Sequence, residues 1–342
     1  MRAAVYYGRH DIRIELIGDP APPGVGELLI RVSKAGICGT DSAEWDHGPV
    51  LAVPPVVLGH EFTGEVVDFG AGVTGFAGGD RIVSGAGISC GICEWCLSGR
   101  TNLCETYRTL GLHVNGGLAE YVLTPASICR KVGSGLDDVS AALAQPMAVA
   151  IHALRRAKTH KGGSAVIIGS GGIGAFLVAG AAEQEVAPLI AVDVDARRLE
   201  TALALGATQV IDATKEDPTA KVLEFTCGLG AHVVVEATGK KGSPQLALNM
   251  VRRGGDVIVL GLHSGMSELD LLELTRREVD LHGTLAHVCA EDLPAALRIL
   301  ERSKLSSAVI DHVIALDALL DEGLSVLAEG RATGKILVDL LS

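Results

Sequence analysis

Four cysteines fall in one short stretch that is rich in glycine and serine. Cys90, Cys93, Cys96 and Cys104 follow the spacing C-x2-C-x2-C-x7-C. Four thiolates this close in sequence can complete the tetrahedral shell of a zinc ion and leave no position for water. The pattern predicts a structural zinc site holding together a lobe, at about residues 88–105, that is too small for its own core. An iron–sulfur cluster is the alternative group for such thiolates.

A thiol, an imidazole and a carboxylate form a second candidate set nearer the N-terminus. Cys38 stands in the sequence GICGTD, and His60 and Glu61 stand in GHEFTGEV. These three side chains suit a Zn²⁺ that keeps one coordination position open, and such a zinc acts as a Lewis acid. A separated Cys and His more often belong to a core. The catalytic interpretation therefore depends on the cysteine stretch and on the dinucleotide motif.

That motif is a GxGxxG turn whose predicted cofactor-binding residues are Gly169, Gly171, Gly172, Ile173 and Gly174. It follows an apolar run at 165–168 and opens a helical stretch at 173–184, which is the context a dinucleotide fingerprint requires. Backbone amides and the helix N-terminus can face a pyrophosphate there.

Cofactor selectivity is predicted from the end of the following strand. Asp193 lies 19 residues after Gly174, where a carboxylate can accept hydrogen bonds from both ribose hydroxyls of NAD and repel the 2′-phosphate of NADP. Asp195 adds a second negative charge. Arg197 and Arg198 could hold that phosphate, so NADP stays open as the alternative, and Arg198 is counted among the cofactor-binding residues. We favour NAD.

Two kinds of element must position these side chains. The first 145 residues contain short β-prone runs, such as 27–32, 62–69 and 81–83, separated by Gly, Pro and Asp. From about residue 147, apolar runs alternate with Ala- and Leu-rich helical stretches, which is typical of a parallel sheet covered on both faces. The six runs are 165–169, 189–193, 209–212, 232–237, 257–260 and 279–282. We therefore predict an α/β protein with a doubly wound, six-stranded parallel sheet beside a β-rich domain.

The length and the net charge of the chain exclude some classes of partner. The chain has 342 residues, enough for two domains, and its formal net charge of −12 argues against a nucleic-acid or anionic-membrane partner. No apolar run is long enough for a membrane span, and the N-terminal residues reach charge and glycine too soon for a signal peptide. We expect a cytoplasmic protein, in which clustered cysteines are metal ligands rather than disulfides.

Taken together, these motifs resemble the zinc-dependent alcohol dehydrogenases of the medium-chain dehydrogenase/reductase superfamily, and most closely its sorbitol, butanediol and threonine dehydrogenase branch. The resemblance runs along essentially the whole chain. Besides the sets above, it includes GDRI at 79–82, GGLAEY at 116–121 and QPMAVAIHA at 145–153.

The resemblance implies a domain plan and site roles. It implies a GroES-like catalytic domain over residues 1–146, a Rossmann NAD-binding domain over 147–284, and a segment 285–342 that returns to the first domain. Cys38, His60 and Glu61 match the catalytic zinc ligands or the carboxylate that approaches the metal. Asp41 matches the acid that orients the liganding histidine, and Thr40 matches the hydroxyl that takes the alcohol's proton. The family forms dimers or tetramers, and we expect a homotetramer.

Two positions depart from the family pattern. Gln145, counted with the catalytic zinc ligands, stands where the polyol branch usually has Glu, and some zinc glucose dehydrogenases also have Gln there. A neutral amide leaves the metal site less negative and gives weight to an aldose substrate. Ala43 stands where relatives often place a proton-relaying His. His47 is one replacement for it, and a solvent-exposed histidine is the other interpretation.

The expected activity is hydride transfer between a secondary alcohol or polyol and NAD, giving the ketone, with two zinc ions per chain, one catalytic and one structural. The alternatives within the zinc enzymes are an aldose dehydrogenase and an L-threonine dehydrogenase. A dinucleotide-binding protein without alcohol chemistry is the alternative from another class.

Overall fold

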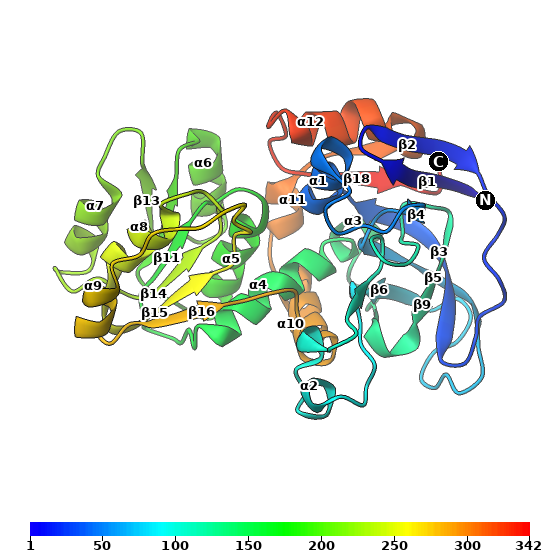
Figure 1. The fold of residues 1–342 in the computed structure, drawn as a ribbon, viewed down its shortest axis with the longest axis horizontal. Coiled ribbons are helices and arrows are strands. Elements are labelled where there is room, and N and C mark those ends of the chain that lie inside the picture. The colour runs from blue at the N-terminus through cyan, green and yellow to red at the C-terminus, as the bar shows by residue number, and fades with distance from the viewer. The chain divides into compact units, whose positions relative to one another are not determined.

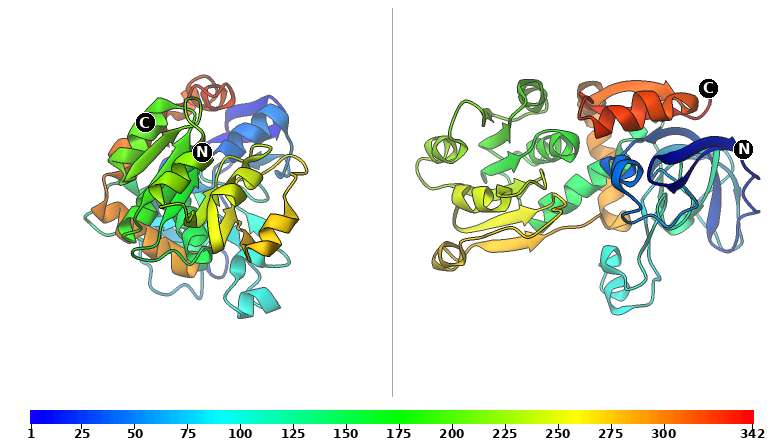
Figure 2. Two further views of the ribbon diagram at one scale, coloured as in Figure 1. Left: turned by 90° about the vertical axis from the view of Figure 1, so that its left-hand side faces the viewer. Right: turned by 45° about the horizontal axis from the view of Figure 1, so that its top comes forward.

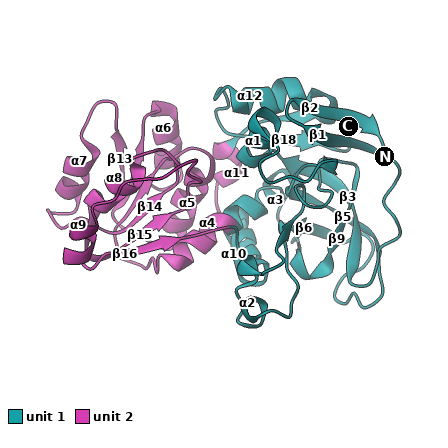
Figure 3. Cartoon of the chain, in the orientation of Figure 1, with its two compact units in different colours: residues 1–148, 286–302, 310–342 teal, residues 149–285, 303–309 magenta.

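The computed structural model describes residues 1–342, which divide into two compact units (Figure 3). Unit 1 comprises Met1–Ala148, Ala286–Arg302 and Ile310–Ser342, and unit 2 comprises Val149–Leu285 and Ser303–Val309. Residues 303–309 are predicted from the sequence to belong to the segment that returns to the first domain, whereas the structure places them in unit 2. Every helix is too short or too polar to span a lipid bilayer.

Unit 2 is built on the parallel six-stranded sheet that the sequence predicts, in the order β13-β12-β11-β14-β15-β16 (Figure 1). Because β11 and β12 are buried along their whole length, their sequences are continuous apolar runs rather than alternating ones. The strands are β11 (Ala165–Ile168), β12 (Leu189–Asp193), β13 (Gln209–Asp212), β14 (Ala231–Glu236), β15 (Val251–Val259) and β16 (Asp280–Gly283).

Helices lie on both faces of this sheet (Figure 2). They are α5 (Gly172–Glu183), α6 (Ala196–Ala204), α7 (Pro218–Phe225), α8 (Ser243–Met250), α9 (Leu271–Arg276) and α11 (Leu305–Val309). The short helix α11 packs against α5 and α6, which explains why residues 303–309 belong to unit 2. The strand order 3-2-1-4-5-6 reverses between β11 and β14, and a dinucleotide binds at the carboxyl ends of the strands at such a point.

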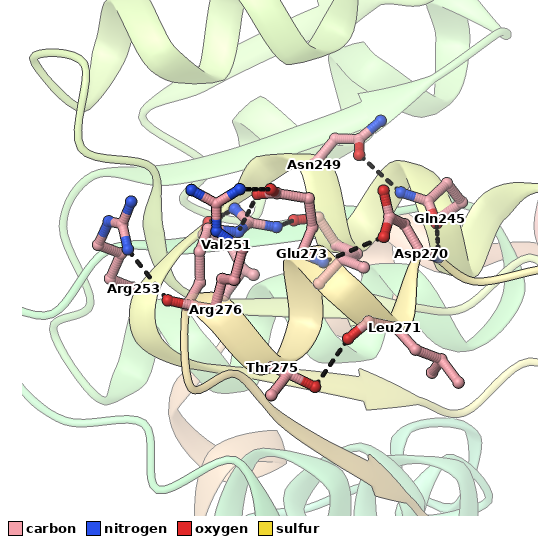
Figure 4. A network of polar contacts seen from close by, with 11 residues as sticks. Gln245, Asn249, Val251, Arg253, Asp270, Leu271, Glu273, Thr275 and Arg276 are labelled. Carbon is pink, nitrogen blue, oxygen red and sulfur yellow. Dashed lines mark hydrogen bonds and ion pairs between the residues drawn. The ribbon is translucent and has the colours of Figure 1, made fainter.

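Polar contacts fix α9 to its neighbours (Figure 4). Asp270 caps the N-terminus of α9 by accepting a hydrogen bond from Glu273 N at 3.0 Å, and its own N–H donates to Gln245 Oε1 of α8 at 2.7 Å. At the other end of α9, Arg253 Nη1 of β15 donates to the carbonyl of Arg276 at 3.1 Å. The segment between β15 and α9 is therefore anchored where it enters the helix.

Unit 1 holds three sheets, of which the largest has the order β10-β6-β5-β3-β18-β17, with β9 also paired to β3. The order β2-β1-β4 forms a second sheet and β7-β8 a third. The strands are β1 (Arg2–Gly8), β2 (Asp11–Leu16), β3 (Glu27–Gly36), β4 (Val56–Val57), β5 (Glu61–Phe69), β6 (Arg81–Ser84), β7 (Gly87–Ile88), β8 (Arg108–Thr109), β9 (Tyr121–Pro125), β10 (Cys129–Lys131), β17 (Ile310–Ala315) and β18 (Lys335–Asp339).

The helices of unit 1 are short apart from α10, and α4 continues from unit 1 into unit 2. They are α1 (Gly39–His47), α2 (Glu94–Leu97), α3 (Asp138–Ala141), α4 (Ala144–Arg156), α10 (Cys289–Arg302) and α12 (Ser325–Ala328), with 3-10 turns at 101–103, 126–128 and 316–318 and a π-helical turn at 319–324. The last strand, β18, pairs antiparallel with the end of β3, where Leu337 faces Gly36. That end of β3 leads directly into Cys38.

Candidate metal and cofactor sites

Cys38 lies at the junction of β3 and α1, where it is the N-cap residue of the helix. Its backbone N–H donates to Asp41 Oδ2 at 2.8 Å, which satisfies a donor that the first helical turn leaves without a partner. Asp41 is completely buried. The local sequence therefore fixes the backbone that carries the thiol, and the helix N-terminus favours negative charge on it.

His60 and Glu61 reach the same place from the start of β5. The ligand atoms of Cys38, His60 and Glu61 all lie within 4.8 Å of one another. Zinc binds thiolate sulfur at about 2.3 Å and imidazole nitrogen or carboxylate oxygen at about 2.0–2.2 Å, so one ion can reach all three atoms. The donor set and its spacing fit the catalytic zinc that the sequence predicts.

Asp41 also faces His60, with its Oδ1 3.8 Å from Nδ1 of the imidazole. Both of these atoms are buried without a hydrogen-bond partner. Burial by itself lowers the pKa of His60, but the negative charges of Cys38 and Asp41 outweigh it and raise that pKa to about 10. Asp41 therefore lies beside the imidazole without a hydrogen bond to it, and its role in orienting His60 stays a prediction.

Lys335 is a member of this group that the sequence analysis missed. It begins β18, and its ammonium forms an ion pair with Glu61 Oε2 in the interior of unit 1. Burial lowers the pKa of Lys335, but the charges of Glu61 and Cys38 more than compensate and raise it above its usual value. No local motif marks this lysine, because its partner stands near the opposite end of the chain.

The remaining predicted residues of this site lie on nearby elements of unit 1. Thr40, in the first turn of α1, has its Oγ1 3.7 Å from Cys38 Sγ. Gln145, the second residue of α4, is buried, and its role as a metal ligand stays a prediction. His47 ends α1, and 71% of its side chain is exposed, beside Asp46.

The four clustered cysteines form the second group. Their sulfur atoms lie within 4.8 Å of one another, with Cys90 Sγ 4.0 Å from Cys96 Sγ. Sulfurs in a tetrahedral zinc shell stand about 3.8 Å apart, given Zn–S bonds of about 2.3 Å. None of the eight cysteines forms a disulfide. The spacing fits a closed zinc site.

Backbone amides already direct hydrogen bonds to these sulfurs. Cys90 N donates to Cys104 Sγ at 3.2 Å, and Cys93 N donates to Cys90 Sγ at 3.4 Å. The first of these bonds lowers the pKa of Cys104 to about 6, whereas burial raises that of Cys96 to about 11. The lobe has no core of its own, since Ile92 and Leu97 are exposed.

In unit 2, the glycine turn connects β11 to α5 with the tight geometry that its sequence predicts. Gly169 has a φ of +90°, which favours glycine, and Gly171 is the N-cap of α5. A Cβ on Gly174 would lie 1.8 Å from the carbonyl oxygen of Gly169, so only glycine lets the helix approach the strand here. The N-terminus of α5, which this turn presents, is the kind of helix end that can bind an anion.

Asp193 ends β12 beside this turn. Its Oδ2 accepts a hydrogen bond from Ser170 N at 2.7 Å, and its Oδ1 accepts from Val194 N at 2.7 Å. Arg198 Nη1 lies 3.8 Å from Asp193 Oδ1. The turn, the carboxylate and the arginine predicted to select the cofactor are thus neighbours within unit 2.

Comparison with known proteins finds two family models and a relative that agree with the candidate sites described above. Residues 24–134 match the family described as "Alcohol dehydrogenase GroES-like domain", and residues 172–302 match "Zinc-binding dehydrogenase". The chain is 32% identical to a sorbitol dehydrogenase of Bacillus subtilis over 91% of this chain and 87% of that protein.

Two solved structures have the same fold. The 2R,3R-butanediol dehydrogenase of Bacillus subtilis superposes with a TM-score of 0.91 at 29% identity, covering 99% of both chains. A zinc-binding dehydrogenase of Sinorhizobium meliloti, solved bound to NADP, superposes with a TM-score of 0.88 at 30% identity, covering 99% of this chain and 98% of that one.

Proposed function

Because the chain belongs to the family of zinc-binding alcohol dehydrogenases, we propose that it oxidises a secondary alcohol, diol or sugar alcohol to the ketone with NAD⁺. The observation that carries this proposal is the convergence of Cys38, His60 and Glu61 in unit 1, with the Thr40 hydroxyl beside them. A dinucleotide-binding protein without alcohol chemistry would not need this group.

Two zinc ions per chain are part of the proposal. Cys38, His60 and Glu61, with Gln145 as a further ligand, would hold the first, and Cys90, Cys93, Cys96 and Cys104 would hold the second. In the first site, a bound zinc supplies Lewis-acid polarisation of the substrate hydroxyl. The second site has no free position and serves to hold the lobe together.

Residues of the chain would accept the proton of the substrate hydroxyl and balance the charge of Glu61. Thr40 Oγ1 accepts the proton of the substrate hydroxyl as it passes its own hydroxyl proton on toward solvent, while the alcohol carbon gives its hydride to the nicotinamide ring of NAD⁺. Asp41 orients the imidazole of His60, and Lys335 balances the charge of Glu61. The proton's route beyond Thr40 does not run through residue 43, which is alanine.

NAD rather than NADP is the proposed cofactor. Support comes from Asp193, whose buried carboxylate is fixed by backbone amides at the edge of the glycine turn. A fixed carboxylate there favours ribose hydroxyls and repels a 2′-phosphate. Arg198 lies close enough to Asp193 to offset part of that negative charge. We therefore expect the enzyme to prefer NAD but still to accept some NADP.

An open sheet edge supports a proposal for assembly, and the cysteines support a proposal for location. The edge strand β16 has no second neighbour, and Leu281 and Leu285 are exposed on and just after it. An open edge of this kind pairs readily with a second copy of itself, and we favour a homotetramer over a dimer. None of the eight cysteines is in a disulfide, which fits a reducing compartment, and we propose the cytoplasm.

The substrate class is tested by activity. Residues 44–55 contain no lysine or arginine that could bind a carboxylate, which favours diols and polyols over L-threonine. We would assay the zinc-replete enzyme with NAD⁺ against diols, sugar alcohols, aldoses and L-threonine. Ketone formation from a diol or sugar alcohol is expected. Cys38→Ser should abolish turnover and remove one of two zinc ions, yet leave NADH binding within about twofold of wild type. Full activity in Cys38→Ser would refute the mechanism.

A further inference from the structure

Glu236 is a buried carboxylate at the carboxyl end of β14 that the proposed chemistry does not use. It is inaccessible to solvent, and its Oε1 accepts hydrogen bonds from Thr238 N at 2.7 Å, Gly239 N at 3.0 Å and Ser243 Oγ at 2.9 Å. Thr238 and Gly239 belong to the turn that leads from β14 into α8, and Ser243 is the first residue of α8. One oxygen of Glu236 therefore fixes residues 237–243, which we call the first loop.

The same residue also binds the segment that follows β15. The other carboxylate oxygen, Oε2, lies 3.0 Å from Nε2 of His263, and the main-chain carbonyl of Glu236 accepts from Leu260 N at 2.9 Å and Gly261 N at 3.1 Å. We call residues 260–270 the second loop. It is held at this end by Glu236 and at its far end by the contact of Asp270 with Gln245 (Figure 4).

The two loops touch backbone to backbone. A Cβ on Gly261 would lie 2.1 Å from Gly239 N, and a Cβ on Gly239 would lie 2.5 Å from the carbonyl oxygen of Leu262. Contacts this close exclude any side chain at either glycine. The relative position of the loops is therefore set by the glycines and by the Glu236–His263 pair together.

The first loop also contacts the dinucleotide turn. A Cβ on Gly169 would lie 2.6 Å from Thr238 Cγ2, and Ala237 N donates to the carbonyl of Ile168 at 2.9 Å. A dinucleotide bound at the reversal of strand order has its adenosine half on the β12 side, next to Asp193. Its nicotinamide half then lies over the ends of β14 and β15, which carry the two loops.

The geometry points to Glu236 and His263 as a positioning pair that holds the two loops in place for the nicotinamide half of the cofactor. Neither residue is placed on the reacting atoms; the pair acts through the backbone of residues 237–243 and 260–263. The inference rests on the proposed function, because it requires that this edge of the sheet bind NAD.

The test compares two nucleotides that differ only in whether they carry the nicotinamide group. NADH and ADP-ribose share the adenosine diphosphate ribose part, and only NADH carries nicotinamide. We would measure the Kd of both, by calorimetry, for zinc-replete wild type, His263→Leu and His263→Gln. Loss of a hydrogen bond to a charged group should raise the Kd for NADH about tenfold in His263→Leu. The Kd for ADP-ribose should stay within about twofold, and His263→Gln, which keeps a donor, should recover most of the NADH affinity.

A matched control is available at the other end of the same strand. His232 Nδ1 lies 2.7 Å from Ser164 Oγ at the amino end of β14, so His232→Leu also removes a histidine hydrogen bond from this sheet. It should leave the ratio of the two Kd values unchanged. Equal weakening of NADH and ADP-ribose by His263→Leu, unchanged NADH affinity, or no recovery in His263→Gln would each overturn the inference. If wild type binds neither nucleotide, the proposed function itself fails.

Discussion

The ammonium of Lys335 and the carboxylate of Glu61 form a buried ion pair next to Cys38 and His60. Only 14% of the Lys335 side chain and 3% of the Glu61 side chain are exposed. The pair places the positive charge of Lys335 beside the acidic groups Cys38, Glu61 and Asp41. Lys335 therefore reduces the mutual repulsion of the acidic groups that would hold a divalent metal.

Replacement of Lys335 should destabilise unit 1 strongly. Lys335→Met leaves Glu61 charged and buried without its partner, which costs about 3–5 kcal/mol of unfolding free energy. Urea denaturation of the zinc-free protein, in which no metal neutralises Glu61, measures this cost. The double variant Glu61→Gln/Lys335→Met should recover a large part of it, because no charge is then left unpaired. A loss below about 1 kcal/mol in Lys335→Met would contradict the role of the pair.

Glu236 should make the protein sensitive to acid. Burial alone raises the pKa of Glu236, but hydrogen bonds from Thr238, Ser243 and His263 hold it below its usual value. A carboxyl whose pKa is lowered by folding contributes stability that is present above about pH 4.3 and is lost as the pH falls through the folded pKa. The Tm of wild type should therefore fall more steeply below pH 5 than the Tm of Glu236→Gln. Parallel Tm profiles for the two proteins would rule this contribution out.

Asp193 should determine the preference for NAD over NADP. Asp193→Ala removes the negative charge that repels the 2′-phosphate, so the ratio of kcat/KM for NAD to that for NADP should fall at least about tenfold. It also leaves Ser170 N and Val194 N without their acceptor, at a cost of about 1–3 kcal/mol. Asp217→Ala is the matched control, because it removes a similar backbone cap from α7. It should leave the cofactor ratio unchanged, and an unchanged ratio in Asp193→Ala would refute the assignment.

Two glycines of the dinucleotide turn should differ sharply in their tolerance of alanine. In Gly174→Ala the new methyl meets the fixed carbonyl of Gly169, so we expect a loss of about 2–3 kcal/mol and impaired NADH binding. In Gly171→Ala the methyl meets the guanidinium of Arg198 at 2.9 Å, which can move away. Thermal denaturation should therefore give Gly171→Ala a Tm near that of wild type. Equal Tm losses in the two variants would contradict the claim that the contact between residue 174 and the Gly169 carbonyl requires glycine.

The lobe at residues 88–105 should depend on its metal. Cys104→Ser removes one thiolate ligand, so the zinc content should fall from two ions per chain to one. Trypsin should then cut rapidly at Arg100 in the lobe or at Arg108 just after it. Cys129→Ser, which changes a buried thiol near Ser84 and Thr124, should keep both ions and resist cleavage. Retention of two zinc ions in Cys104→Ser would exclude the four-cysteine site.

The sequence predicted those features that arise from neighbours in the chain. The six-stranded sheet and the glycine turn follow from periodicity and spacing over short segments. The two candidate groups of metal ligands were also named from the sequence, and the structure brings the members of each group together. Lys335 and the Glu236–His263 pair could not be predicted, because each depends on strands that meet only in the folded chain. The same reason explains residues 303–309, whose place with unit 2 is set by packing of α11 on α5 and α6.

The position of β18 has a consequence for how the protein is made. Strand β3 is synthesised early, but Gly36 at its end cannot pair with Leu337 until β18 has been synthesised. Lys335, the counter-charge of Glu61, arrives with the same strand. During synthesis, Glu61 therefore stays without this ion pair until almost the whole chain has been translated. A truncation of even the last ten residues would remove Lys335 and leave Glu61 without its ion-pair partner.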